Sequence, residues 1–349
     1  MRNSIIACYV IGKKKMEESI TTDDNQNILI DVFRLTKKFE NIPAVNEISF
    51  SLKKGEIFGF LGPNGAGKTT TINMLTGLSR PDSGTIRVAG LDCTGNPKAA
   101  QHLIGIVPDE SNLYPELSGF DNLCFCASLY GIRKEERRKR AGELLQAFGL
   151  KEAAHRKFGG YSKGMKRKLT IAAGIIHHPQ ILFLDEPTTG IDVAGARQIR
   201  QLVADLHNTG TTIFLTTHYI EEAERLCERI AFIAKGRIVK TDTVENLLQP
   251  LMGRQMMSLA VSGGAENLLG ALSGAFPDFR FQIVSSEQIR IESAGPISLG
   301  PLVRFMEEHT TEVTEARRLI PTLEDVFVSV TGVEADILKK EAEKKGGAA

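Results

Sequence analysis

Short apolar runs of two kinds recur along the chain before about residue 240, separated by turns rich in glycine and proline. Alternation of apolar and polar residues over 29–39 and 45–52 predicts two half-buried strands, and 85–88 adds a third. These strands should form a small, mostly antiparallel sheet. Continuous apolar runs, which are typical of buried strands in a parallel sheet, lie at 57–61 and 181–184, and the next strand is predicted at 212–217.

A mainly helical stretch is predicted from about residue 110 to 149, after a short apolar strand at 103–107. Its charged segment 133–140 carries both signs, which is typical of a solvated helix face. A further helix is predicted after Ser162, whose hydroxyl is placed to cap it. Apolar side chains also crowd a loop near the start of this stretch, which suggests a surface kept for a partner: Leu113, Tyr114, Leu117 and Phe120.

A second pattern begins after Pro250 and Gly253, which mark a domain boundary. Strands are predicted at 256–261, 279–284, 289–292 and 312–317. Helices are predicted at 265–272 and 299–307, which gives the order strand, helix, strand, strand, helix, strand. This order predicts a small α+β domain of the ferredoxin-like, split βαβ kind, and it contains no catalytic constellation.

Composition narrows the class of protein. A chain of 349 residues allows two domains, and 42% hydrophobic residues is enough for ordinary cores. The net charge of +1 gives no long-range attraction to nucleic acid, so no nucleic-acid partner is expected. The five cysteines form no metal or disulfide framework. No stretch approaches the roughly 20 apolar residues that span a bilayer, so membrane contact is expected only through a partner.

The two ends of the chain differ in character from the rest. Residues 1–27 end in a polar run and are expected to form a flexible extension, in which Met16 is an alternative start to Met1. Lysines 13–15 follow the short apolar segment 5–11. In a secretory signal the positive charges come before the apolar segment, so such a signal is not expected here. Residues 333–349 are expected to form a charged tail, of which 339–349 should be disordered.

The strongest chemical motif follows the apolar run at 57–61. Residues 62–69 match G-x-x-x-x-G-K-[ST] in the strand, turn and helix context that this pattern requires. Glycines let backbone N–H groups converge on phosphate oxygens, and the helix adds the positive end of its dipole. Lys68 would reach the β- and γ-phosphates, and the Thr69 hydroxyl would coordinate Mg²⁺. The nucleotide-binding set is Gly62, Pro63, Asn64, Gly65, Ala66, Gly67, Lys68, Thr69 and Thr70, the last without a chemical role of its own.

Two more strand ends carry ionisable residues. Asp185 and Glu186 follow the run at 181–184, and His218 follows the run at 212–217. Because the carboxyl ends of parallel strands line one crevice, Lys68, Glu186 and His218 should face a common site. There Asp185 would support Mg²⁺, and Glu186 would polarise an attacking water.

Two local features leave alternatives open. Phe39, at the end of the first strand, is suited to stack on an adenine ring or to belong to the core or the sheet edge. Ser162 begins a helix whose N-terminus is either a second anion site or an ordinary cap.

Taken in order, these elements strongly resemble the nucleotide-binding subunit of an ATP-binding cassette (ABC) transporter. They are the loop 62–69, Asp109 after a strand, Tyr161-Ser162-Lys163-Gly164-Met165, Asp185-Glu186, Thr189-Gly190-Ile191-Asp192 and His218. The resemblance implies an α/β P-loop NTPase fold over 28–240, with a RecA-like core, an antiparallel β subdomain and a helical subdomain at about 110–165. Residues 250–332 resemble the accessory domain of exporter ATPases.

The resemblance also implies chemistry and partners. ATP and Mg²⁺ would be the cofactors, with Lys68, Glu186 and His218 in catalysis. Phe39 would stack on adenine, Ser162 and Gly164 would close over the γ-phosphate held by a second subunit, and Gly190 and Asp192 would couple the two sites. The metal set would be Thr69, Asp109 and Asp185. The expected assembly is a homodimer with two ATP at its interface, docked by the helical subdomain on a separate membrane permease at the cytoplasmic face, and driving export.

Two positions depart from the family pattern. Asp109 stands where the family usually has glutamine, and Lys163 replaces a glycine of the signature. Three alternatives stay open: a soluble ABC ATPase acting in translation or on DNA, a small-molecule kinase, and a regulatory ATP-binding subunit that does not hydrolyse. The single cassette without a basic charge disfavours the first. The second would need neither the signature nor His218, and intact Glu186 and His218 disfavour the third.

Overall fold

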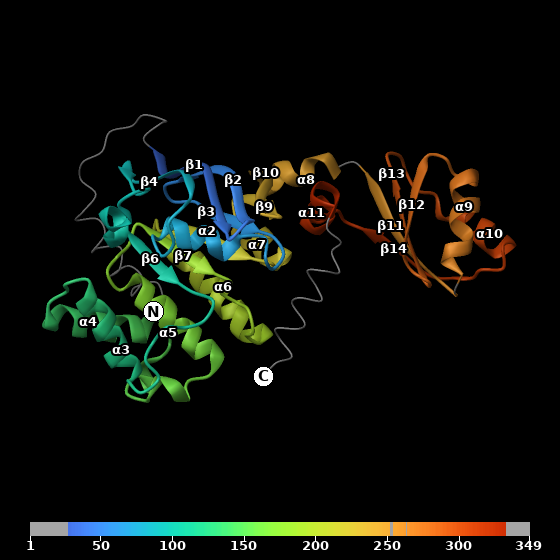
Figure 1. Ribbon diagram of the computed structural model, residues 1–349. Coiled ribbons are helices and arrows are strands. Elements are labelled where there is room, and N and C mark those ends of the chain that lie inside the picture. Colours follow the sequence, from blue (N-terminus) through green and yellow to red (C-terminus); the bar gives the residue numbers. More distant parts are fainter. Residues whose placement is uncertain (1–26, 252–253, 263, 333–349) are drawn as a thin grey trace. The chain divides into compact units, whose positions relative to one another are not determined.

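The computed structural model describes residues 27–251, 254–262 and 264–332 (Figure 1). They form two compact units: residues up to Val244 together with those from Phe327 onward, and Glu245–Val326. The last helix, α11 (Leu323–Thr331), therefore ends in the first unit, where the Phe327 ring meets Phe232 edge-on at 5.4 Å. The sequence places this end of the chain in the accessory domain. The expectations for residues 1–27 and 333–349 lie outside the described residues, apart from Asn27.

A six-stranded sheet forms the centre of the first unit, in the order β10-β9-β3-β8-β7-β6. The strands β9, β3, β8, β7 and β6 are mutually parallel, and β10 pairs antiparallel with β9. Their bounds are β3 (Ile57–Leu61), β6 (Ile104–Val107), β7 (Ile181–Asp185), β8 (Thr212–Thr217), β9 (Arg229–Ala234) and β10 (Arg237–Thr243). Every residue of β3, β7 and β8 is buried, as the apolar runs of β3 and β7 predict; β8 buries three threonines as well.

Phe214 of β8 lies at the centre of an aromatic cluster in this core. Its ring centroid is 5.4 Å from those of Phe60 and Phe183 and 5.9 Å from those of Phe50 and Phe58. Phe50 comes from a different sheet, so the cluster joins the two sheets of the unit. It holds β3 and β8 in place, and both strands lead directly into site residues.

The second sheet has the order β2-β1-β4-β5, with every pairing antiparallel as predicted. Its strands are β1 (Ile28–Phe39), β2 (Ile42–Lys53), β4 (Ser83–Val88) and β5 (Leu91–Asp92). The helices and short 3-10 segments of this unit are α2 (Lys68–Leu75), Pro97–Leu103, α3 (Gly119–Leu129), α4 (Lys134–Ala147), Lys151–Ala153, Phe158–Gly160, α5 (Lys163–Ile175), α6 (Val193–Asn208) and α7 (Ile220–Leu226). Figure 1 shows α3, α4 and α5 gathered in one group; α3 and α4 fall within the range 110–165 expected for the helical subdomain, and α5 extends beyond it. Within the described part of the chain, none of the helices has the length and apolar character that crossing a membrane requires.

The second unit begins with α8 (Val244–Leu248) and the turn Gln249–Leu251 and contains a four-stranded antiparallel sheet, ordered β12-β13-β11-β14. The elements follow the predicted order: β11 (Gln255–Val261), α9 (Ala265–Ala275), β12 (Phe279–Ser285), β13 (Gln288–Ser293), α10 (Leu299–Glu308) and β14 (Val313–Leu319). Its core joins the helices to one face of the sheet through residues such as Leu259, Leu272, Ile291 and Met306.

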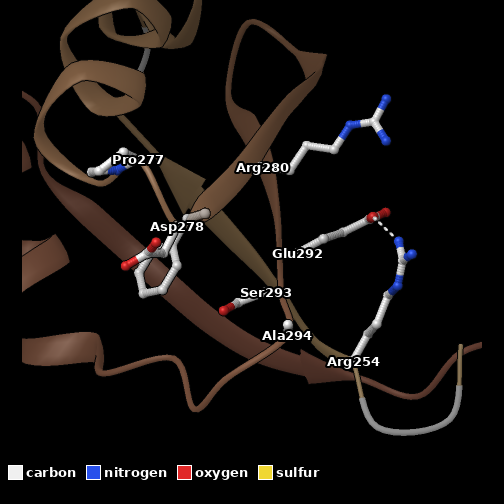
Figure 2. Close-up of a pocket in the computed structure, with 8 residues that line it drawn as sticks. Arg254, Pro277, Asp278, Arg280, Glu292, Ser293 and Ala294 are labelled. Carbon is white, nitrogen blue, oxygen red and sulfur yellow. Dashed lines mark ion pairs between the residues drawn. The ribbon is translucent and has the colours of Figure 1, made fainter.

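A small cavity of about 220 Å³ lies in this second unit (Figure 2). In Figure 2 the side chains of Arg254 and Glu292 point toward each other, and their ion pair measures 3.9 Å. The lining residues are Arg254, Pro277, Asp278, Phe279, Arg280, Glu292, Ser293 and Ala294. Two arginines and two carboxylates balance each other here, so the cavity offers no net charge to a nucleotide.

Removing the central ring tests the role of the aromatic cluster. We expect Phe214→Ala to lower the free energy of unfolding by about 3–5 kcal/mol, because a buried aromatic side chain leaves a cavity that cannot fully close. Urea unfolding followed by far-ultraviolet circular dichroism measures the change. Phe33→Ala is the matched control, since Phe33 is 59% exposed and its loss should change stability by less than about 0.5 kcal/mol. Equal midpoints for the two variants would contradict a core centred on Phe214.

Candidate nucleotide-binding site

Residues 62–67 form a loop between the buried strand β3 and helix α2, as the motif predicts. Gly65 and Gly67 have φ angles of +75° and +105°, a region that favours glycine. A Cβ on Gly67 would collide with the carbonyl oxygen of Ala44 in β2, and one on Gly62 would collide with that of Ile233 in β9. Two other strands therefore confine the loop, and only glycine fits at its close approaches.

Lys68 begins helix α2, and its side chain folds back over the loop. Its Nζ donates hydrogen bonds to the carbonyl oxygens of Gly62 at 2.7 Å and Pro63 at 3.2 Å. It also lies 3.1 Å from Oε1 of Glu186, and both side chains are 5% exposed. The ammonium is thus held where the phosphate loop and the carboxylate at the end of β7 converge.

Asp185 and the Thr69 hydroxyl meet beside this ion pair. Thr69 Oγ1 donates to Asp185 Oδ2 at 2.9 Å, and Thr216 Oγ1 donates to Asp185 Oδ1 at 2.5 Å. Burial raises the pKa of Asp185, and the hydrogen bonds from Thr216 and Thr69 offset part of that rise. No group of three or more histidine, cysteine or carboxylate residues among the described residues is arranged to hold a metal ion. A hydroxyl beside a carboxylate fits Mg²⁺ that takes its remaining ligands from phosphate and water.

Glu186 is the most constrained residue of the site. Its Oε2 lies 2.7 Å from Nδ1 of His218 and accepts a hydrogen bond from Thr189 Oγ1 at 3.2 Å. Burial alone would raise the pKa of Glu186, but the hydrogen bond from His218 and the positive charge of Lys68 outweigh it and lower that pKa to about 2. Glu186 is therefore firmly ionised while Lys68 is its partner.

His218 links the end of β8 to this carboxylate. Because an ionised carboxylate only accepts hydrogen bonds, Nδ1 of His218 carries a proton and donates the hydrogen bond to Glu186. Its second ring nitrogen, Nε2, is buried and has no hydrogen-bond partner among the described residues. A buried polar atom without a partner points to a bound ligand that would satisfy it.

The structure brings Lys68, Thr69, Asp185, Glu186 and His218 together as predicted. Other predicted residues lie on separate segments. Phe39 is 54% exposed at the end of β1, with Lys37 Nζ 5.7 Å from its ring centroid. Ser162 is exposed and caps α5 by accepting from Met165 N–H at 3.3 Å. Gly164 is half-buried near the start of the same helix, and Thr70 is half-buried in α2.

Arg167 is a site residue that the sequence did not single out. It is 7% exposed on α5, and its guanidinium donates to the carbonyl oxygens of Pro108, Asp109 and Glu186 at 2.6, 2.7 and 3.2 Å. Asp109 is linked to the site through this arginine. Backbone carbonyls carry no sequence signature, so nothing in the sequence pattern indicates that Arg167 would bind them.

The prediction of an apolar partner surface on the loop at 113–120 is only partly correct. Leu113 is buried and Leu117 and Phe120 are half-buried, because the buried Asn122 side chain exchanges hydrogen bonds with both backbone groups of Tyr114 and draws the loop onto α3. Tyr114 alone of the four is exposed. The exposed apolar surface of the helical subdomain instead consists of Tyr114, Phe125, Leu129 and Tyr130.

A glycine loop between a buried parallel strand and a helix, with a lysine and a carboxylate pair at neighbouring strand ends, defines a P-loop nucleotide hydrolase. A family model described as ABC transporter matches residues 45–189. The linearmycin resistance ATP-binding protein LnrL of Bacillus subtilis (strain 168) is 38% identical over 307 residues, which cover 87% of this chain and 98% of that protein. The chain therefore belongs to the ABC transporter family, as one of its ATP-binding, ATP-hydrolysing subunits.

Two further comparisons agree. The Nod factor export ATP-binding protein I of Rhizobium etli is 34% identical over 307 residues, which cover 88% of this chain and 94% of that protein. Among solved structures, a dimeric post-hydrolysis state of the ATP-binding cassette MJ0796, bound to ADP and Pi, superimposes with a TM-score of 0.57 at 28% identity. It covers 61% of this chain and 98% of that one.

The low pKa of Glu186 predicts a pH dependence of stability. Its folded pKa of about 2 lies below its ordinary value of 4.5, so its stabilising contribution is full above pH 4.5 and is lost as the pH falls toward 2. Relative to Glu186→Gln, the wild type should lose on the order of 3 kcal/mol of unfolding free energy across that window. Urea midpoints of the two proteins between about pH 6 and pH 2 measure the difference. Other buried carboxyls are common to both proteins, so parallel pH curves would contradict the ion pair.

Proposed function

We propose that this chain is the ATPase of an exporter: a homodimer that hydrolyses ATP at the cytoplasmic face of a membrane and moves a separate permease subunit. The observation that carries the proposal is the buried arrangement of Lys68, Glu186 and His218, with the unpartnered Nε2 of His218 beside them. The names of related proteins support the direction, since one relative acts in linearmycin resistance and another in Nod factor export. The cargo would depend on the permease.

ATP would be held by the loop amides of 62–67 and by Lys68, with adenine stacked on the exposed ring of Phe39. Mg²⁺, when bound, would neutralise charge on the phosphates. Thr69 and Asp185 would hold it, and Asp109 would complete the set from the loop after β6. The half-buried Thr70 follows Thr69 in α2.

Phosphate would compete with Glu186 for Lys68. As long as Lys68 contacts Glu186, the pKa of about 2 makes this carboxylate a weak base. When Lys68 turns to a phosphate, that cause of the low pKa is removed, and Glu186 becomes a better acceptor for a proton from the attacking water. His218 would then hold Glu186 through Nδ1–H, and its Nε2 would donate to a γ-phosphate oxygen when that nitrogen also carries a proton.

The dimer proposal rests on residues that stand apart from the Lys68 cluster. Ser162 is exposed at the N-terminus of α5, where helix N–H groups and the dipole favour an anion. Asp192 is likewise exposed and caps α6, shortly after Gly190. Such residues complete a site if a second copy approaches head to tail, and one related cassette is dimeric with ADP and Pi bound.

The permease would dock on the helical subdomain. Tyr114 and Phe125 meet edge-on at 5.2 Å, and Leu129 and Tyr130 follow them at 69% and 44% exposure. Four large apolar side chains grouped on one subdomain fit a protein partner, because contact with it would remove them from water.

Hydrolysis measured against protein concentration tests the proposal. In the purified wild type with Mg²⁺ and ATP, the rate should grow with the square of protein concentration at low concentration, because each site needs two copies. Glu186→Gln should bind ATP yet hydrolyse it at least about 100-fold more slowly, because it lacks the general base. Phosphate release and equilibrium ATP binding are the two measurements.

Glu152→Gln is the matched control, since Glu152 is an exposed glutamate of the helical subdomain and this variant should hydrolyse ATP like the wild type. A rate linear in protein concentration would refute the shared site. Near-normal turnover by Glu186→Gln would remove that residue from the mechanism.

A further inference from the structure

Arg167 is a buried cation that the proposed mechanism leaves without a task. Its guanidinium donates three hydrogen bonds to backbone carbonyl oxygens, those of Pro108, Asp109 and Glu186. These belong to two different strand ends, that of β6 and that of β7, while Arg167 itself belongs to α5. One side chain therefore ties the helix of the signature segment to both strand ends beside the nucleotide site.

The tie to Glu186 falls on a strained peptide. Glu186 has a φ of +48°, which costs a residue with a Cβ on the order of 1 kcal/mol. Its N–H donates to the carbonyl of Thr216 at 3.1 Å, and its own carbonyl accepts from Arg167 at 3.2 Å. The backbone is thus held on both sides in a conformation that it would otherwise leave, and this conformation directs the carboxylate toward Lys68 and His218.

The same guanidinium accounts for the acidic residue where the family usually has glutamine. Arg167 Nη2 lies 3.6 Å from Oδ1 of Asp109. Burial lowers the pKa of Arg167, and the neighbouring carboxylates of Asp109, Asp185, Glu222 and Glu186 act to raise it. A fixed cation next to Asp109 offsets the negative charge that this carboxylate adds beside the phosphates.

We propose that Arg167 is a positioning residue for ATP hydrolysis. It couples the position of the Glu186 carboxylate to the positions of α5 and of the loop at Pro108 and Asp109. The rigid guanidinium of Arg167 would transmit a movement of α5 to the Glu186 peptide. Glu186 would then be aligned with the attacking water in only one position of the helical subdomain. This inference rests on the proposed role of Glu186 in hydrolysis.

Two substitutions separate this role from simple packing. Arg167→Gln removes the charge and the fork, and Arg167→Lys keeps the charge but cannot bridge three carbonyls. In both, kcat should fall about tenfold to hundredfold, because a displacement of a catalytic group by about 1 Å has that effect. The ATP dissociation constant should stay within about twofold, because Arg167 lies outside the phosphate loop. The matched control is Arg140→Gln, since Arg140 also donates to a backbone carbonyl, that of Ile176, and its loss should leave kcat unchanged.

The decisive comparison is made in the Glu186→Gln background. If Arg167 acts through Glu186, the double variant Arg167→Gln, Glu186→Gln should be no slower than Glu186→Gln alone. A further loss equal to that in the wild type would overturn the proposal, and so would an unchanged kcat in both Arg167 variants or a loss of ATP binding in parallel with kcat. Should Glu186→Gln itself turn over normally, the proposed role of Glu186 fails instead, which a separate measurement of that variant reveals.

Discussion

The ion pair between Lys68 and Glu186 is the constraint on which the rest of the site depends. Both side chains are almost fully buried, and a buried charge without a partner would cost several kcal/mol. Each residue therefore needs either its counter-charge or other polar partners to replace it. In the proposed mechanism nucleotide phosphate would become the counter-charge of Lys68, and Glu186 would keep its hydrogen bond from His218 and gain the attacking water. Nucleotide binding and activation of the base would thereby be linked through one exchange of partners.

The fold meets this constraint by placing three strand ends side by side. The strands β3, β8 and β7 are adjacent and parallel, so their carboxyl ends deliver Lys68, His218 and the pair Asp185 and Glu186 to one edge of the sheet. The Phe214 cluster holds these strands together within the core. The second sheet contributes by contact, since the carbonyl of Ala44 closes on Gly67 and fixes the shape of the phosphate loop.

The sequence predicts the buried strands and most of the site residues at their ends. The elements and contacts that it does not predict were missed for identifiable physical reasons. Buried parallel strands leave continuous apolar runs, and a residue that follows such a run must lie at the sheet edge, so Lys68, Glu186 and His218 could be placed together. The strands β9 and β10 were missed, although Lys235 and Gly236, both at positive φ, form a tight turn between two apolar segments. Arg167 could not be predicted as a site residue, because three of its partners are backbone carbonyls. Leu113 was wrongly predicted on a partner surface, because the buried Asn122 side chain draws its loop inward.

The most direct test of this exchange compares the ATP affinity of the wild type with that of Lys68→Ala. Calorimetry without Mg²⁺ measures both affinities, because ATP is then not hydrolysed. If phosphate replaces Glu186 as the partner of Lys68, the alanine variant should bind ATP at least about tenfold more weakly, since it loses a charge-assisted contact worth about 1.5–3 kcal/mol. Equal affinity in the two proteins would show that Lys68 serves only to pair with Glu186, and would contradict the exchange of partners between carboxylate and phosphate.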